Sequence, residues 1–125
     1  MKSRFGFAIA VLASVALAPA FAAEAPAKFE GGVLVGAKGM TLYTFDKDTA
    51  GSGKSACDAA CVNNWPPLYA PDGASASGDY TVATLYNGKK MWAYKGKPVY
   101  YWVKDKKAGD QTGDGVGKVW HVIKQ

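Results

Sequence analysis

Two stretches of the chain, Tyr-Thr-Phe-Asp-Lys-Asp at residues 43–48 and Tyr-Tyr-Trp-Val-Lys-Asp at residues 100–105, carry one pattern. In both, an aromatic residue follows the tyrosine by two positions, and an aspartate follows it by five. The match extends upstream to a Lys-Gly pair, at residues 38–39 and 95–96. Each copy of such a repeat is usually a supersecondary unit that cannot bury its apolar face alone. The sequence therefore predicts one small pseudo-symmetric domain made of two similar halves.

Short apolar runs and frequent turn signals indicate the fold class. We place a single domain over residues 33–125, with one repeat at 33–68 and the other at 80–125. The runs are too short for helices, and Gly, Pro and Asn interrupt them too often. They are typical of strands joined as hairpins. We therefore expect an all-β, or β-dominated, domain in which both repeats contain a hairpin.

Three turns are expected to close hairpins. The first lies at residues 36–39, between apolar runs that span 33–45. The second is Asn87-Gly88, between strands at 80–85 and 89–94, and the third spans residues 95–98. Glycine at these places supplies the positive φ that tight turns need.

One short helix is expected beside the two cysteines. The segment Ser55–Val62 contains both Cys57 and Cys61, and Ser55 is its predicted N-cap. The Pro-Pro pair at residues 66–67 prevents this helix from continuing.

The ordered set of motifs resembles a known bacterial family. Besides the two tyrosine motifs, the set contains the cysteine pair, Trp-Pro-Pro-Leu at 65–68, the run 92–98 and the run 113–122. These resemble the secreted repeats of unknown function, also described as predicted lipoproteins with a Tyr-x-(Phe/Trp/Tyr)-x-x-Asp motif. The resemblance implies an exported envelope protein, and it brings no established activity and no catalytic residues.

The first residues are typical of a secretory signal peptide. Lys2 and Arg4 precede an apolar run, and Ala20-Phe21-Ala22 offers the small residues that signal peptidase reads. We expect a signal peptide at residues 1–22 and a flexible leader at 23–32. Because no cysteine stands at the cleavage point, we expect a periplasmic or secreted protein without a lipid anchor or membrane span.

The charge argues against a nucleic-acid partner. The formal net charge is +5, and loss of Lys2 and Arg4 with the signal lowers it by two. All remaining cations are lysines, whereas specific phosphate and base recognition favours arginine. A mildly basic surface of this kind serves solubility, or a weak attraction to anionic envelope components.

The cysteines allow two interpretations. In an exported protein a close pair such as Cys57 and Cys61 favours a disulfide. Alternatively, two thiolates and His121, the single histidine of the chain, are the ligand types that a copper-handling protein uses, and the same pair suits thiol redox chemistry.

The repeated acids also allow two interpretations. Asp48 and Asp105 would form a paired carboxylate site if the repeats faced each other. An aspartate at a fixed offset after a strand more often accepts backbone N–H groups and fixes a turn, which is the interpretation we favour. No Ser/His/Asp or Cys/His arrangement has a supporting motif, so we do not expect an enzyme and predict no cofactor.

The aromatic residues exceed what strand propensity requires. Some must form the core, since the chain has little Leu and Ile, and others could line a ligand groove. The candidate groove consists of Trp65, Trp92, Tyr94, Tyr100 and Trp102.

The sequence thus favours a non-catalytic binding or structural module of the bacterial envelope. The copper or thiol-redox protein and the glycan or peptidoglycan binder stay open as alternatives. The ligand and the oligomeric state are not specified by the sequence.

Overall fold

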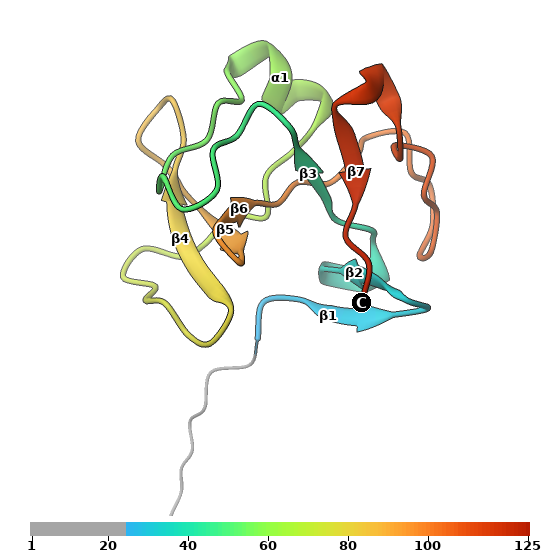
Figure 1. The fold of residues 1–125 in the computed structure, drawn as a ribbon, viewed down its shortest axis with the longest axis horizontal. Helices are drawn as coiled ribbons and strands as arrows, with labels where there is room; N and C mark the ends of the chain where they lie inside the picture. Colours follow the sequence, from blue (N-terminus) through green and yellow to red (C-terminus); the bar gives the residue numbers. More distant parts are fainter. Residues whose placement is uncertain (1–24) are drawn as a thin grey trace, which may run out of the picture.

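Three small antiparallel sheets form the molecule (Figure 1). The computed structural model describes residues 25–125, so the expected signal peptide lies outside the described residues. The first sheet pairs β1 with β2, the second pairs β3 with β7, and the third has the order β4-β5-β6. The strands are β1 (Lys28–Glu30), β2 (Val33–Val35), β3 (Tyr43–Phe45), β4 (Tyr80–Thr84), β5 (Lys90–Tyr94), β6 (Lys97–Pro98) and β7 (Trp120–Val122).

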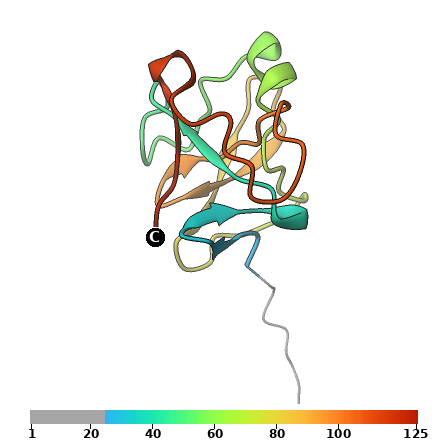
Figure 2. The same ribbon diagram turned by 90° about the vertical axis from the view of Figure 1, so that its right-hand side faces the viewer.

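Helical structure is scarce in the described residues. The α-helix is α1 (Ala59–Asn64), and two 3₁₀ turns are η1 (Ala37–Gly39) and η2 (Val116–Lys118). None of these is long and apolar enough to cross a membrane. The helix α1 and the β1–β2 hairpin lie at opposite ends of the molecule (Figure 2). The prediction of a β-dominated fold with one short helix near the cysteines is confirmed.

The two repeats interlock at their motif tyrosines. Tyr43 and Tyr100 form an antiparallel bridge, with N–O distances of 2.8 and 3.0 Å between their backbones. Each tyrosine also pairs with the closing segment of the other repeat: Tyr43 pairs with Val122 of β7, and Tyr100 bridges Pro67. Because each half completes the other, neither repeat is a separate unit.

The Lys-Gly pair of the repeat adopts the same backbone conformation in both copies. The φ angles are 59° and 73° at Lys38 and Gly39, and 49° and 86° at Lys95 and Gly96. Two successive positive φ values close tight turns, so the repeat keeps a glycine there. At Gly96 a Cβ atom would also lie only 2.8 Å from the backbone nitrogen of Gly51, which leaves no room for a side chain.

The predicted hairpins form at residues 80–94 and around residues 95–98. β4 pairs with β5 from Tyr80–Tyr94 to Thr84–Lys90, and β5 pairs with β6 across the Lys95-Gly96 turn. The first predicted hairpin, over residues 33–45, forms only near its turn, where Val35 bridges Thr41. Beyond it β3 pairs with β7, because the closing strand of the second repeat takes that edge.

Two sequence-based boundaries need correction. The expected flexible leader at residues 23–32 instead contains β1, whose Phe29 pairs with Leu34 of β2. The expected helix start at Ser55 is also wrong, since α1 begins at Ala59 with Asp58 as its N-cap. The Asp58 carboxylate accepts a hydrogen bond from the Cys61 N–H at 3.0 Å. Ser55 is not available as a cap, because its hydroxyl bonds Tyr100 and Cys57.

Buried side chains form two clusters. The larger contains both aromatic and small residues from both repeats, and the smaller includes Leu34 of β2. The larger cluster is built from Tyr43, Phe45, Cys57, Trp65, Ala83, Leu85, Met91, Ala93, Tyr100 and Trp120. The smaller is built from Ala27, Leu34, Leu42, Leu68 and Val99.

Candidate functional site

The tyrosine and aspartate of the repeat motif bond each other across the two repeats. The Tyr43 hydroxyl donates to Asp105 Oδ2 at 2.7 Å, and the Tyr100 hydroxyl donates to Asp48 Oδ2 at 2.7 Å. Both tyrosines are fully buried, and both aspartates are almost so. The pairing is therefore exchanged: each repeat supplies the partner of the other repeat's tyrosine.

The second oxygen of each carboxylate binds backbone. Asp48 Oδ1 accepts from the Ala56 N–H at 2.6 Å, and Asp105 Oδ1 accepts from the N–H and the hydroxyl of Thr112 at 3.0 and 2.6 Å. The two acids thus hold the loops that follow them. They do not face each other as a carboxylate pair, because each is directed at a tyrosine and a loop.

Burial raises the pKa of three of the motif groups, Tyr43, Tyr100 and Asp48. Removal from water raises the pKa of Tyr43 and of Tyr100 well above the ordinary value, so both phenols are protonated donors at neutral pH. Burial likewise raises the pKa of Asp48, although the Ala56 and Tyr100 hydrogen bonds and the charge of Lys97 oppose it. Since the Tyr100 proton points to Asp48, Ser55 is the donor in its 2.6 Å bond to Tyr100.

Four aromatic rings form a continuous stack through the core. Phe45 stacks on Trp120 with ring centroids 4.2 Å apart, Trp120 on Trp65 at 3.8 Å, and Trp65 on Trp102 at 4.0 Å. The motif aromatics Phe45 and Trp102 are the two ends, and each contacts a tryptophan of the other repeat. Trp120 was not among the predicted site residues, but its spacing signals its role, since a tryptophan follows each motif tyrosine by about the same distance: Trp65 after Tyr43, and Trp120 after Tyr100.

The structure divides the predicted aromatic groove into two places. Trp65 and Tyr100 are buried, and Trp102 is stacked on Trp65, so these three belong to the core. Trp92 and Tyr94 instead lie half-buried on β5 and line a separate cleft. The five residues therefore do not form one groove.

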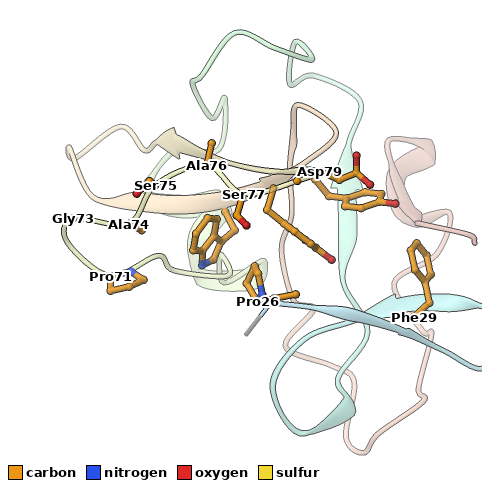
Figure 3. A pocket seen from close by; sticks show the side chains of 14 residues that line it. Pro26, Phe29, Pro71, Gly73, Ala74, Ser75, Ala76, Ser77 and Asp79 are labelled. Carbon is orange, nitrogen blue, oxygen red and sulfur yellow. The ribbon is translucent and has the colours of Figure 1, made fainter. Parts of the chain in front are cut away.

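The cleft that Trp92 and Tyr94 line has a volume of about 770 Å³. Phe29 and Tyr80 add two more half-buried rings, and the loop at residues 71–79 supplies small and hydroxyl-bearing side chains. Figure 3 shows the loop residues from Pro71 to Asp79 along one side, with Pro26 and Phe29 across from them.

Strand alternation places these rings on one face. Along β5, Met91 and Ala93 are buried in the larger core, so Trp92 and Tyr94 face the opposite side. Tyr80 stands directly across from Tyr94 in the β4–β5 ladder, with ring centroids 5.4 Å apart. Phe29 meets Tyr94 edge-on at 5.8 Å from β1. Phe29 was not among the predicted groove residues, because its segment was expected to be a flexible leader. Tyr80 was not among them either, because its position opposite Tyr94 depends on the strand register, which the sequence does not give.

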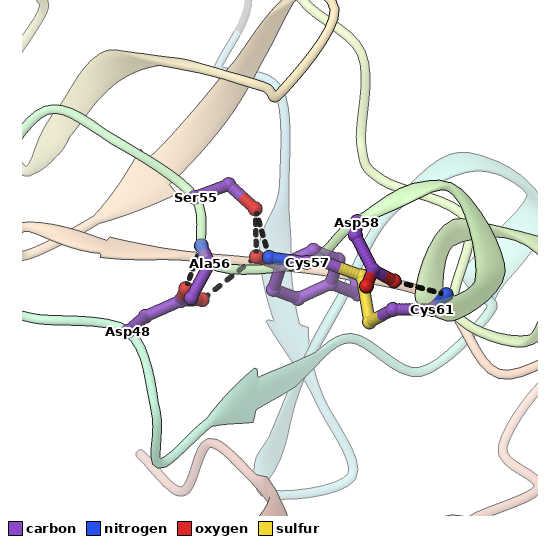
Figure 4. The surroundings of a disulfide bond; sticks show 7 residues. Asp48, Ser55, Ala56, Cys57, Asp58 and Cys61 are labelled. Atoms are coloured by element: carbon purple, nitrogen blue, oxygen red, sulfur yellow. Dashed lines mark hydrogen bonds between the residues drawn. A yellow bond between two sulfur atoms is a disulfide. The ribbon is translucent and has the colours of Figure 1, made fainter.

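The two cysteines are joined. Cys57 and Cys61 form a disulfide with Cα atoms 5.2 Å apart, as predicted, next to the segment in which the Ala56 N–H bonds Asp48 (Figure 4). Cys57 is fully buried, and its N–H donates to the Ser55 hydroxyl at 3.0 Å. The disulfide thus fixes the loop that Asp48 also holds.

His121 lies apart from the disulfide network. Its Nε2 is 2.9 Å from Oδ2 of Asp46, the residue that follows the paired strand β3. Among residues 25–125, no group of three or more His, Cys, Asp or Glu side chains is arranged to hold a metal ion. The copper alternative requires Cys57, Cys61 and His121 together, and the structure does not place them so.

These features define a small β protein of two interlocked repeats that exchange tyrosine–aspartate hydrogen bonds. The sequence model of the family described as "secreted repeat of unknown function" matches the chain twice, at residues 28–69 and 81–124. The protein belongs to this family of secreted repeats. No curated protein and no solved structure is significantly similar to the chain.

Proposed function

We propose that this secreted repeat protein is a non-catalytic binding module of the bacterial envelope that holds a glycan in the cleft formed by β1, the β4–β5 hairpin and the 71–79 loop. The observation that carries the proposal is the wall of half-buried rings, Phe29, Tyr80, Trp92 and Tyr94, which pack against the smaller core cluster and also line an open cleft.

The chemistry of the cleft suits sugars. The face of a pyranose presents C–H groups that pack on aromatic rings, while its hydroxyls need polar neighbours. Ser75, Ser77 and Asp79 line the same cleft and offer such partners. The rings are also held in place by their strands, which lowers the entropy cost of binding.

A non-catalytic role is supported by what the other polar groups do. The Tyr43–Asp105 and Tyr100–Asp48 pairs are committed to holding the two repeats together. The cysteines are joined in a disulfide, and His121 bonds Asp46 on the surface. A periplasmic location remains part of the proposal, and cell fractionation with an intact-mass measurement tests it: we expect a mature chain that starts at Ala23 without lipid.

The binding test uses the four tryptophan indoles as reporters. Trp92 lines the cleft, whereas Trp65, Trp102 and Trp120 lie in the core stack and serve as internal controls. Titration of ¹⁵N-labelled protein with neutral tetrasaccharides of glucose and of N-acetylglucosamine, and with soluble peptidoglycan fragments, should shift the Trp92 Nε1–H resonance selectively.

Two variants sharpen the test. Tyr94→Ala should weaken binding about tenfold or more, since an aromatic anchor is lost. Tyr86→Ala removes a ring that is 55% exposed and outside the cleft, so it should change nothing. If no glycan in the panel moves the Trp92 indole, the proposed function is wrong.

A further inference from the structure

A second hollow continues the cleft beyond Phe29 and Tyr94. It has a volume of about 540 Å³, and it shares those two rings with the first cleft. Its lining contains three lysines, Lys95, Lys97 and Lys124. A ligand that rests on the rings therefore meets ammonium groups at one end.

Two of these ammonium groups have fixed positions. Lys97 Nζ donates to the backbone oxygens of Phe45 and Asp48 at 3.0 and 3.2 Å. Lys95 Nζ lies 5.5 Å from the centroid of the Tyr94 ring, on the ring that both hollows share. A cation over a tyrosine face is held by the ring quadrupole, so its charge stays close to the rings.

The charge balance of the combined surface is positive. Asp79 is the acidic side chain among the residues that line the two hollows, and it belongs to the serine-containing loop of the first cleft. Lysines near a surface attract anions and add specificity for charge, even where each contact is weak. The rings thus favour a sugar face and the lysines favour a negative group attached to it.

Building on the proposed function, we infer that the ligand is an acidic glycan, in which carboxylate-bearing sugars stack on Trp92 and Tyr94 while their carboxylates meet Lys95, Lys97 and Lys124. Single-stranded nucleic acid combines rings and negative charge too. It fits less well, because the mature chain has no arginine to grip phosphates.

The test compares two matched probes, a tetramer of galacturonic acid and the same tetramer after reduction of its carboxyl groups to alcohols. Both are titrated at low salt with the Trp92 indole resonance as readout. We expect the acidic tetramer to bind about tenfold more tightly, and added salt to weaken only the acidic one.

Lysine variants locate the charge contact. Lys95→Gln and Lys124→Gln should each weaken binding of the acidic tetramer by about two- to fivefold, and should weaken it more than binding of the reduced tetramer. Lys118→Gln, on η2 and outside both hollows, is the matched control and should have no effect. Lys97 is kept, since it also bonds the backbone of the first repeat.

The outcomes separate this inference from the proposed function. Equal affinity for the two tetramers would overturn the acidic ligand and leave a glycan-binding cleft. If neither tetramer shifts Trp92, the inference fails, and the proposed function fails only if the neutral tetrasaccharides and the peptidoglycan fragments are silent too. If a thymidine oligonucleotide of equal charge binds more tightly than the acidic tetramer, the ligand is a nucleic acid and the acidic-glycan inference is wrong.

Discussion

The two repeats share their centre and differ at their edges. In both, a buried tyrosine donates to the aspartate of the other repeat, and a tryptophan of one repeat stacks on the motif aromatic of the other. Outside this centre the first repeat has a short hairpin, β1–β2, and a disulfide, whereas the second has the longer β4–β5 hairpin and no cysteine. The symmetric part holds the fold together, and the cleft arises where the two unlike hairpins meet.

A single position illustrates the difference. In the first repeat the Ala56 N–H binds Asp48, and the next residue is Cys57. In the second repeat the Thr112 N–H binds Asp105, and the next residue is Gly113. Cys57 is fully buried and forms the disulfide. A Cβ atom at Gly113 would lie 2.9 Å from the Tyr43 ring and 3.0 Å from Trp65 and Trp102. The first repeat thus places a covalent link where the second packs backbone against aromatic rings.

The largest effect should come from removing either motif tyrosine. Tyr43→Ala and Tyr100→Ala should each lower the free energy of unfolding by roughly 2–5 kcal/mol, because each ring is fully buried. Urea unfolding followed by circular dichroism measures both. Tyr86→Ala, which is exposed, should change stability by less than about 0.5 kcal/mol. Losses below about 1 kcal/mol at both motif positions would remove the tyrosines from the structural centre.

The disulfide should add to the free energy of unfolding a contribution that comes from the first repeat and has no counterpart in the second. In the chain-entropy model so short a loop contributes about 2 kcal/mol, so the Cys57→Ser, Cys61→Ser double variant should unfold more easily by that amount and keep its fold. Reduced wild-type protein should match the variant. Detection of two free thiols in isolated, unreduced protein would contradict the link.

A double-mutant cycle tests the exchange of partners between repeats. Tyr43→Phe combined with Asp105→Asn should show a coupling of about 1 kcal/mol, because their side chains bond directly. Tyr43→Phe combined with Asp48→Asn should be additive within about 0.5 kcal/mol, since Asp48 bonds Tyr100 instead. Coupling between residues of the same repeat, with none across, would show that the halves are not exchanged.

The centre of the fold was predictable from the repeat itself. Its tyrosine, aromatic and aspartate positions identified a two-part domain, and the turn glycines located the hairpins at 80–94 and 95–98. The exchange was not predictable, because a repeat is consistent with bonds inside one copy or between copies. Contacts between distant segments decide between them: the Tyr43–Tyr100 bridge and the two tyrosine–aspartate hydrogen bonds.

The cleft was predictable only in part, for a different reason. Trp92 and Tyr94 were identified as groove residues, but the sequence grouped them with Trp65, Tyr100 and Trp102, which are core. Composition does not distinguish a ring that fills a core from one that lines a cleft. The distinction comes from the structure. Side chains alternate between the two faces along β5, and Phe29 lies on a strand, β1.

The smallest predicted effect is on the pH dependence of stability. The contributions of Asp48 in the first repeat and Asp110 in the second should change with pH in opposite directions. Burial raises the pKa of Asp48 above the ordinary 3.8, so the folded protein keeps a proton that the unfolded chain releases. The contribution of Asp48 is therefore fully present below about pH 3.8 and is lost as the pH rises through the folded pKa. In the second repeat, hydrogen bonds from Lys107 and Lys106 lower the pKa of Asp110, so its contribution is present above about 3.8 and is lost as the pH falls.

Unfolding measurements at several pH values should thus give opposite trends for two variants. The stability of the wild type relative to Asp48→Asn should decrease as the pH rises from about 4 to neutrality, whereas its stability relative to Asp110→Asn should decrease slightly as the pH falls below about 4. The Asp110 trend should also weaken with salt, because that residue bonds Lys107 at the surface, whereas the Asp48 trend should persist, because it arises from burial. Parallel trends for the two variants would mean that the hydrogen bonds to the Asp48 carboxylate outweigh the effect of its burial, and the raised pKa of Asp48 would then have to be abandoned.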